Sequence, residues 1–224
     1  MKNILFIFIP IICFWSCSGQ KSVNTSSQSS SKQGKYYIPD TIYNFFPNTT
    51  NSATSNKLVF ESTNSEEVEL PYFCDEFAVS YIAKIYEFSD KDFFDSLKNA
   101  YLAKSIFKSN TENNNYKIIG SEREMLNLYD TVILKNYFQN YQNPLILNFH
   151  DILKLEPSFS DSTTICGIEK GYKILVLNSG SNFVLPDKYR CEWYILPSRL
   201  SHGFSSGVAI NEIKLSIIYW VVAW

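Results

Sequence analysis

Residues 203–224 read GFSSGVAINEIKLSIIYWVVAW. They contain two strand-like, mostly apolar runs, residues 203–210 and 213–224, on either side of Asn211 and Glu212. Short apolar runs rich in β-branched and aromatic residues predict strands, and a polar pair between two such runs predicts a tight hairpin turn. Towards its end the second run is apolar at consecutive positions, which is typical of a strand covered on both faces. We therefore expect a hairpin whose last strand is central or well covered.

Further strands precede this hairpin. The strand-like runs at residues 172–177 and 189–196 are bounded by turn residues, among them Gly180 and Pro186. Consecutive strands with short connections favour an antiparallel sheet. Residues 145–224 are therefore predicted to be the strand-rich part of the domain.

The region before Pro144 has helical spacing instead. Apolar residues recur there at every fourth position, at Phe73, Phe77, Tyr81 and Ile85. Residues four apart lie on one face of a helix, and Pro71 stands where proline is favoured, at the first helical position. These features predict an amphipathic helix over residues 71–88.

Two more helices are predicted after it. One starts behind Ser89 and runs to about Lys108. The other starts at Ser121, where Ser-Glu-Arg-Glu forms a capping box, and Pro144 ends it. The helical part thus covers residues 71–142. Helices first and strands afterwards predict an α+β fold, with about three amphipathic helices followed by an antiparallel sheet of about four to six strands.

The first residues have the features of a secretion signal. Lys2 supplies a positive charge, and residues 4–15 form an apolar run. A membrane-spanning helix needs roughly 20 apolar residues, so this run has the length of a signal-peptide core. Residues 1–16 are therefore predicted to be a signal peptide.

The segment Phe14-Trp15-Ser16-Cys17 resembles the lipobox of bacterial lipoproteins, in the looser form of the Bacteroidota. The resemblance implies cleavage before Cys17, diacylglycerol on its thiol and usually an acyl chain such as palmitate on the new amino group. The match is incomplete, because the family usually has Leu in place of Phe14 and a smaller residue in place of Trp15. One alternative is ordinary secretion with cleavage after Ser18, and another is an uncleaved membrane anchor.

The chain that follows has the composition of a tether. Residues 18–34 are almost entirely polar or glycine, with Val23 as the only aliphatic residue. Such a segment cannot bury enough apolar surface to fold, so residues 17–35 are predicted to link the lipidated cysteine to a single globular domain, residues 36–224. Acidic residues do not follow Cys17 closely, which by the same resemblance implies an outer-membrane location facing the periplasm.

Charge and composition restrict the partners. The chain has 20 basic and 22 acidic residues, a net charge of −2, and its basic residues form no cluster longer than a pair. Nucleic acid is therefore not expected as a partner. Aromatic residues make up 16% of the chain, and we expect most of them to pack in the core, with a binding platform for sugars or peptides as the alternative.

The domain has three cysteines, Cys74, Cys166 and Cys191. Cys74 falls on the predicted helix over residues 71–88, in line with its apolar face. Cys166 and Cys191 both lie in the strand-rich part, where a bridge closing a loop of about 25 residues would contribute roughly 3 to 4 kcal/mol. They are the candidate disulfide of an oxidising compartment, although separate thiols are the alternative.

One formal catalytic motif occurs, Gly203-Phe204-Ser205-Ser206-Gly207, which fits the G-x-S-x-G nucleophile elbow. The elbow requires a helix after the serine, whereas a strand and a hairpin are predicted here. Its base also follows the serine in sequence, whereas His150 and His202 both precede Ser205. We therefore assign no catalytic residue and interpret the glycines as part of a strand or turn.

Metal and cofactor sites are not predicted either. The two histidines are too far apart in sequence to define metal-ligand spacing, and the chain has no Cys-x-x-Cys pair, P-loop or dinucleotide fingerprint. The sequence thus predicts a non-enzymatic lipoprotein, attached to the membrane through lipid on Cys17, whose domain binds a protein or another envelope component. A serine hydrolase using Ser205 with His202 or His150 is one alternative, and a toxin-neutralising, immunity-type lipoprotein is another.

Overall fold

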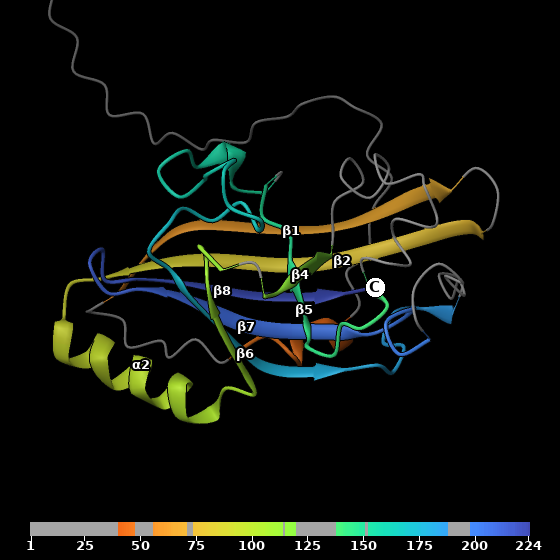
Figure 1. The fold of residues 1–224 in the computed structure, drawn as a ribbon. Coiled ribbons are helices and arrows are strands. Elements are labelled where there is room, and N and C mark those ends of the chain that lie inside the picture. The colour runs from red at the N-terminus through yellow and green to blue at the C-terminus, as the bar shows by residue number, and fades with distance from the viewer. Residues whose placement is uncertain are drawn as a thin grey trace, which may run out of the picture. The chain divides into compact units, whose positions relative to one another are not determined.

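The computed structural model describes residues 40–47, 56–70, 74–113, 115–119, 138–150, 152–187 and 198–224. Within these ranges the main element is a six-stranded antiparallel sheet with the order β1-β2-β8-β7-β6-β3 (Figure 1). Its strands are β1 (Asn56–Leu70), β2 (Cys74–Phe88), β3 (Phe107–Asn110), β6 (Lys173–Gly180), β7 (Phe204–Asn211) and β8 (Ser216–Ala223). A separate pair of parallel strands consists of β4 (Lys117–Ile119) and β5 (Leu145–Leu147).

The predicted C-terminal hairpin is confirmed. β7 and β8 pair antiparallel from Phe204 opposite Ala223 to Asn211 opposite Ser216, and every residue of both strands is buried. The central position predicted for the last strand is also correct, because β8 lies between β2 and β7. The connection is longer than the predicted tight turn and spans residues 212–215.

The predicted helix over residues 71–88 is wrong. Residues 74–88 form strand β2, which pairs antiparallel with β1 on one side and with β8 on the other. A spacing of four fits a helical turn, but it is also two periods of a strand, so the apolar positions Tyr81 and Ile85 face the core in either structure. The aromatic and β-branched content of this segment favours the strand. The free edge of β8 supplies the backbone partners for it.

The second predicted helix exists but is shorter. α2 covers Lys91–Lys104, and the carboxylate of its N-cap Asp90 accepts a hydrogen bond of 3.0 Å from the amide of Phe93. The following residues leave the helix to pair with β6 as β3, so the helix does not reach Lys108. The third predicted helix lies almost entirely outside the described residues.

The fold class must therefore be corrected. The described residues form mainly antiparallel sheet, with only two short α-helices, α1 (Asp40–Tyr43) and α2, and a 3-10 turn, η1 (Leu153–Leu155). The arrangement is α+β only in a loose sense, and three helices do not precede the sheet. In the described part of the chain no helix has the length and apolar character needed to cross a membrane.

The sheet is covered on both faces. One face packs against β4, β5 and residues 149–168, with a core that includes Tyr81, Ala83, Ile85, Ile174, Val176, Ala209, Ile218, Trp220 and Val222. The other face packs against α2, α1 and residues 183–185, with a core that includes Ile82, Phe94, Leu97, Leu175, Val208, Ile210, Ile217, Tyr219 and Val221. Two buried faces explain why β7 and β8 have no alternation between apolar and polar residues.

Candidate functional site

Ser205, the candidate nucleophile, is not at an exposed turn. It lies inside β7, where its register partners are Val222 of β8 and Ser179 of β6. The residue is fully buried, and its Oγ has no hydrogen-bond partner among the described residues. A nucleophile elbow needs the hydroxyl exposed above a sheet, so the geometry gives no support to the hydrolase alternative.

Packing explains the two glycines of the motif. A Cβ on Gly203 would lie 2.5 Å from the carbonyl oxygen of Gly180 and 3.1 Å from the ring of Trp224. A Cβ on Gly207 would lie 2.3 Å from the carbonyl oxygen of Leu175 and 2.8 Å from the ring of Trp220. The spacing of four between the glycines thus matches the spacing of four between Trp220 in β8 and Trp224 directly after it.

The two histidines have structural contacts. His150 Nε2 lies 3.2 Å from the carbonyl oxygen of Ile165, which accepts a hydrogen bond from the tautomer protonated at Nε2. The backbone of His150 lies against Gly167, whose φ is +80°. A Cβ on Gly167 would lie 2.5 Å from the backbone nitrogen of His150. The ring of His202 packs edge-on against Phe183, with centroids 5.0 Å apart. Asp151, beside His150, lies outside the described residues.

Cys166 is buried, and among the described residues its thiol has no disulfide partner. The hydroxyl of Tyr116 donates a hydrogen bond to its Sγ at 3.4 Å, and burial raises the pKa of the thiol. Its predicted disulfide partner, Cys191, lies outside the described residues. Cys74 belongs to strand β2 and not to a helix, so the reason given for its burial no longer applies.

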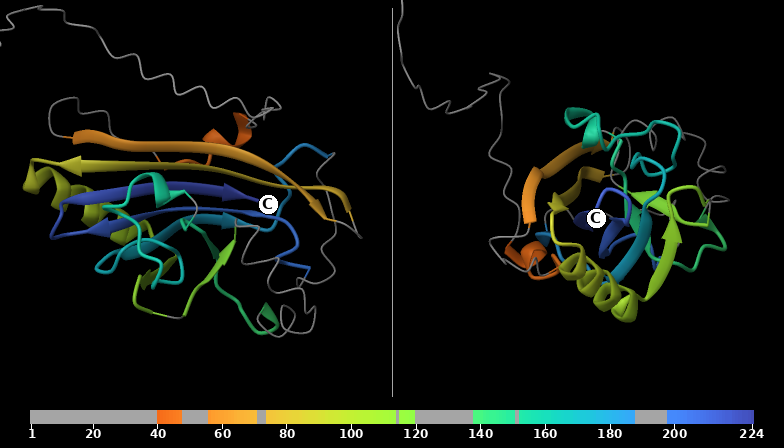
Figure 2. Two further views of the ribbon diagram at one scale, coloured as in Figure 1. Left: turned by 90° about the horizontal axis from the view of Figure 1, so that it is seen from above. Right: turned by 90° about the vertical axis from the view of Figure 1, so that its left-hand side faces the viewer.

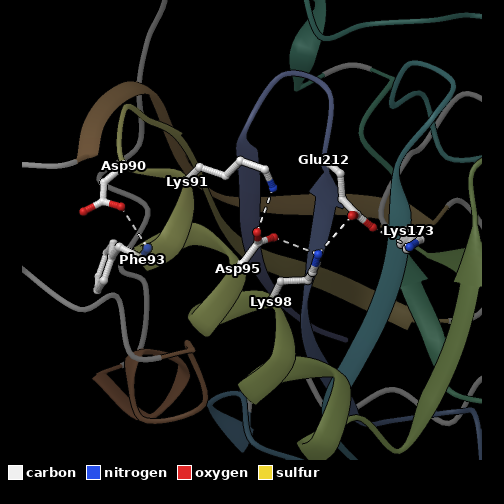
Figure 3. A network of polar contacts seen from close by, with 7 residues as sticks. All are labelled: Asp90, Lys91, Phe93, Asp95, Lys98, Lys173 and Glu212. Carbon is white, nitrogen blue, oxygen red and sulfur yellow. Dashed lines mark hydrogen bonds and ion pairs between the residues drawn. The ribbon is translucent and has the colours of Figure 1, made fainter.

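Charged side chains join the β7–β8 turn to its neighbours, as Figure 3 shows. Glu212 forms ion pairs with Lys98 of α2 at 2.9 Å and with Lys173 of β6. Asp95 of α2 continues the chain, at 2.8 Å from Lys98 and 2.7 Å from Lys91. Hydrogen bonds from Lys173 and Lys98 lower the pKa of the Glu212 carboxyl, and those from Lys91 and Lys98 lower that of Asp95.

Further contacts hold the same turn, namely hydrogen bonds within it and contacts of the Lys214 side chain. The side chain of Asn211 accepts hydrogen bonds from the amides of Ile213 and Lys214, both at 3.0 Å. Lys214 pairs with Glu169 at 2.6 Å, and its Nζ lies over the ring of Phe159. Ile213 is 94% exposed at the tip. These contacts pair the charged side chains of the turn with neighbouring parts of the fold. We therefore interpret the charged residues here as structural and not as a ligand site.

The outer part of the β1–β2 hairpin extends beyond the rest of the sheet. Strand β8 pairs with β2 only over Ser80–Glu87, whereas the β1–β2 hairpin continues beyond Ser80, from Glu66 opposite Val79 to Leu70 opposite Cys74. We call this outer part, residues 66–70 and 74–79, the hairpin arm. Figures 1 and 2 show it running past the end of β8. Among the described residues, neither the outer edge of β1 nor the edge of β2 in the arm has a strand partner.

Sequence reasoning missed the arm because it assigned residues 71–88 to a helix. Two signals were present in the sequence. The residues after Pro71 are rich in β-branched and aromatic types, and no lysine or arginine occurs between Lys57 and Lys84. The second signal describes the edge chemically, because residues 58–83 contain six acidic residues and no basic one.

The remaining predicted sites are not tested by these geometries. Cys17 and the signal peptide lie outside the described residues. In the described part of the chain, no group of three or more His, Cys, Asp or Glu side chains could hold a metal ion. Comparisons with family models, with curated proteins and with solved structures find no match to this chain.

Proposed function

We propose that this protein is a lipid-anchored component of the bacterial cell envelope whose domain binds another polypeptide along the edge of strand β1. The sequence at Cys17 supports the anchor, since a positive start, a short apolar run, a small residue before the cysteine and a polar tether follow one another. The observation that carries the binding role is the hairpin arm, which extends an edge strand beyond the body of its sheet.

An extended edge favours binding because its backbone groups are strong hydrogen-bonding groups. An edge strand presents a row of amides and carbonyls that lack ladder partners, and many proteins bind an extended segment by adding it as a further strand. β1 is 15 residues long, about three times a common strand length, so it offers room for such a segment.

The anchor is tested by fractionation of cells that express the full chain, followed by mass spectrometry of the mature N-terminus. We expect the wild type in the membrane fraction, with a lipid-modified peptide that starts at Cys17. Cys17→Ala should remove the modification, whereas the matched change Cys13→Ala, inside the signal peptide, should leave it intact. Recovery of an unlipidated protein that starts at Gly19 would overturn the anchor.

The binding role is tested by placing a photo-crosslinking amino acid at two exposed positions near opposite edges of the sheet. Leu58 lies on β1 and is 44% exposed, and Ile106 directly precedes β3 and is 59% exposed. We expect one discrete adduct, identified by mass spectrometry, from position 58 and none from position 106. The binding role is refuted when irradiation in cells gives no adduct at position 58.

A further inference from the structure

The geometry points to a specific kind of partner: an extended, lysine- or arginine-rich segment of another protein that adds as a strand to the outer edge of β1 in the hairpin arm. This inference rests on the proposed binding role and specifies its chemistry. It combines the backbone geometry of the edge with the sign of its charge.

The backbone geometry makes the arm an acceptor for a strand. In the arm, β1 and β2 pair only with each other among the described residues, from Glu66 opposite Val79 to Leu70 opposite Cys74. Each strand of a two-stranded ribbon has one unpaired edge, and isolated two-stranded ribbons are marginally stable in water. A third strand would therefore satisfy backbone groups and also stabilise the arm.

The charge of the arm selects the partner. The arm contains five acidic residues, Glu66, Glu67, Glu69, Asp75 and Glu76, and no basic residue, although the whole chain has a net charge of only −2. Like charges directly opposite each other destabilise a strand pair, so a second copy of this edge is a poor partner. A basic segment places opposite charges across the new ladder.

The fold itself contains the pairing that we infer. At the base of the hairpin, Glu61 of β1 and Lys84 of β2 are register partners and form an ion pair of 2.9 Å. Further along β1, the register places Val79 opposite Glu66 and Ala78 opposite Glu67, so no basic residue of β2 stands opposite them. A basic strand on the outer edge would supply these glutamates with cross-strand lysines.

A competing explanation is that the acidic residues only protect a long edge from aggregation, as charged residues often do. The two explanations differ in their response to a basic strand. An edge that is only protective binds neither a basic nor an acidic peptide. An edge that recognises a partner binds the basic peptide, and this binding requires the backbone amides of the peptide.

The experiment uses the full-length protein solubilised in detergent and a fluorescent octapeptide of alternating lysine and valine. Fluorescence anisotropy should show saturable binding that weakens as salt is added, because exposed charges are screened. A peptide of alternating glutamate and valine should not bind. A lysine–valine peptide with alternate amides methylated should also fail, because it lacks the ladder donors. Equal binding of the methylated and unmethylated peptides would overturn the inference.

Variants locate the binding site. The double change Glu66→Gln with Glu67→Gln should weaken binding of the basic peptide about tenfold. The matched change Asp92→Asn with Glu156→Gln removes the same charge elsewhere and should leave binding unchanged. Hydrogen exchange of residues 64–70 should slow when the peptide is added. Unaltered exchange there, or equal effects of the two double changes, would refute strand addition at the arm, while an adduct at position 58 would still support the broader binding role.

Discussion

At the scale of single residues, the large side chains of two tryptophans require glycine at the positions beside them. Trp220 and Trp224 of the C-terminal run lie against Gly207 and Gly203 of the adjacent strand. Both rings are buried, and the indole nitrogen of Trp224 donates a hydrogen bond of 2.8 Å to the carbonyl oxygen of Leu200. The segment that resembles a catalytic elbow thus supplies the two glycines against which the tryptophan rings pack.

Gly207→Ala should destabilise the protein strongly. The new Cβ would meet the Leu175 carbonyl oxygen at 2.3 Å, and a backbone atom in a central ladder cannot move cheaply. Overpacking of this kind costs about 3 kcal/mol, which urea unfolding would measure. Because the nearest obstacle is backbone and not the Trp220 ring, adding Trp220→Phe should not restore stability. Full rescue by that second change would contradict the packing argument.

Ser205→Ala should be neutral or stabilising. The Ser205 hydroxyl is buried without a hydrogen-bond partner among the described residues, so its removal eliminates a desolvation cost of about 1 kcal/mol. Ser216 is the matched control, because it is equally buried in β8 but accepts a hydrogen bond of 3.1 Å from the Tyr172 hydroxyl. Ser216→Ala should therefore lower the free energy of unfolding. The prediction fails when Ser205→Ala is the more damaging change.

At the scale of elements, α2 and the β7–β8 turn stabilise each other. Lys98 and Glu212 connect them, and Lys173 adds strand β6 to the same chain of ion pairs. On the opposite side of the turn, Lys214 contacts Glu169 and donates a hydrogen bond to the carbonyl oxygen of Ser158. The turn therefore joins the coverings of both sheet faces.

Glu212→Gln should weaken the fold in a pH-dependent way. The pKa of Glu212 in the folded protein lies below its ordinary value of 4.5. Its stabilising contribution is therefore fully present above pH 4.5 and is lost as the pH falls through the lowered pKa. Urea unfolding should show a difference of less than about 1 kcal/mol at pH 6 that shrinks on acidification and in high salt. A difference independent of pH would contradict this assignment.

The hairpin arm should be dispensable for folding. Ser65 and Ser80 are register partners at its base, so replacing residues 66–79 by Asn-Gly closes the hairpin with a two-residue turn. The shortened β2 keeps its pairing with β8, and we expect the free energy of unfolding to change by less than about 1 kcal/mol. Binding of the basic peptide should be lost. A loss of several kcal/mol would show that the arm belongs to the core.

At the scale of the whole molecule, the sheet is a layer buried between two coverings that come from distant parts of the sequence. Residues 149–168 cover one face, while α1, α2 and residues 183–185 cover the other. Cys166 lies in the first of these layers and is fully buried. Reagents in solution should therefore reach its thiol only when the layer opens.

Labelling of Cys166 by a thiol reagent should follow global unfolding. In a Cys74→Ser, Cys191→Ser background, burial and the raised pKa of the thiol should keep native labelling slow. The rate should rise with urea in proportion to the unfolded fraction, as measured by tryptophan fluorescence. Fast labelling in native buffer would contradict the buried position. Mass spectrometry of the unreduced wild type separately tests the predicted Cys166–Cys191 bridge.

The sequence alone was sufficient for the elements whose local pattern has a single solution. The runs on either side of Asn211 predicted β7 and β8, because mostly apolar runs of that length between turn residues fit buried strands. The start signal at Ser89 and the residues that follow it predicted α2, although the structure begins the helix after Asp90 and ends it at Lys104, before the predicted end near Lys108. For the candidate site, the sequence shows that the charged residues within 58–83 are all acidic. It does not show that part of this stretch forms the edge of a sheet.

Only the tertiary structure decided between helix and strand for residues 71–88. Apolar residues four apart satisfy the helix period and the strand period alike, so the local pattern has two solutions. The free edge of β8 selects the strand, because it provides backbone partners for Ser80–Glu87 and a buried face for Tyr81 and Ile85. The same choice created the long β1 edge, while the pairing of β7 with β6 and β8 placed Ser205 inside the sheet. The catalytic and binding interpretations could therefore be separated only once the strands were paired.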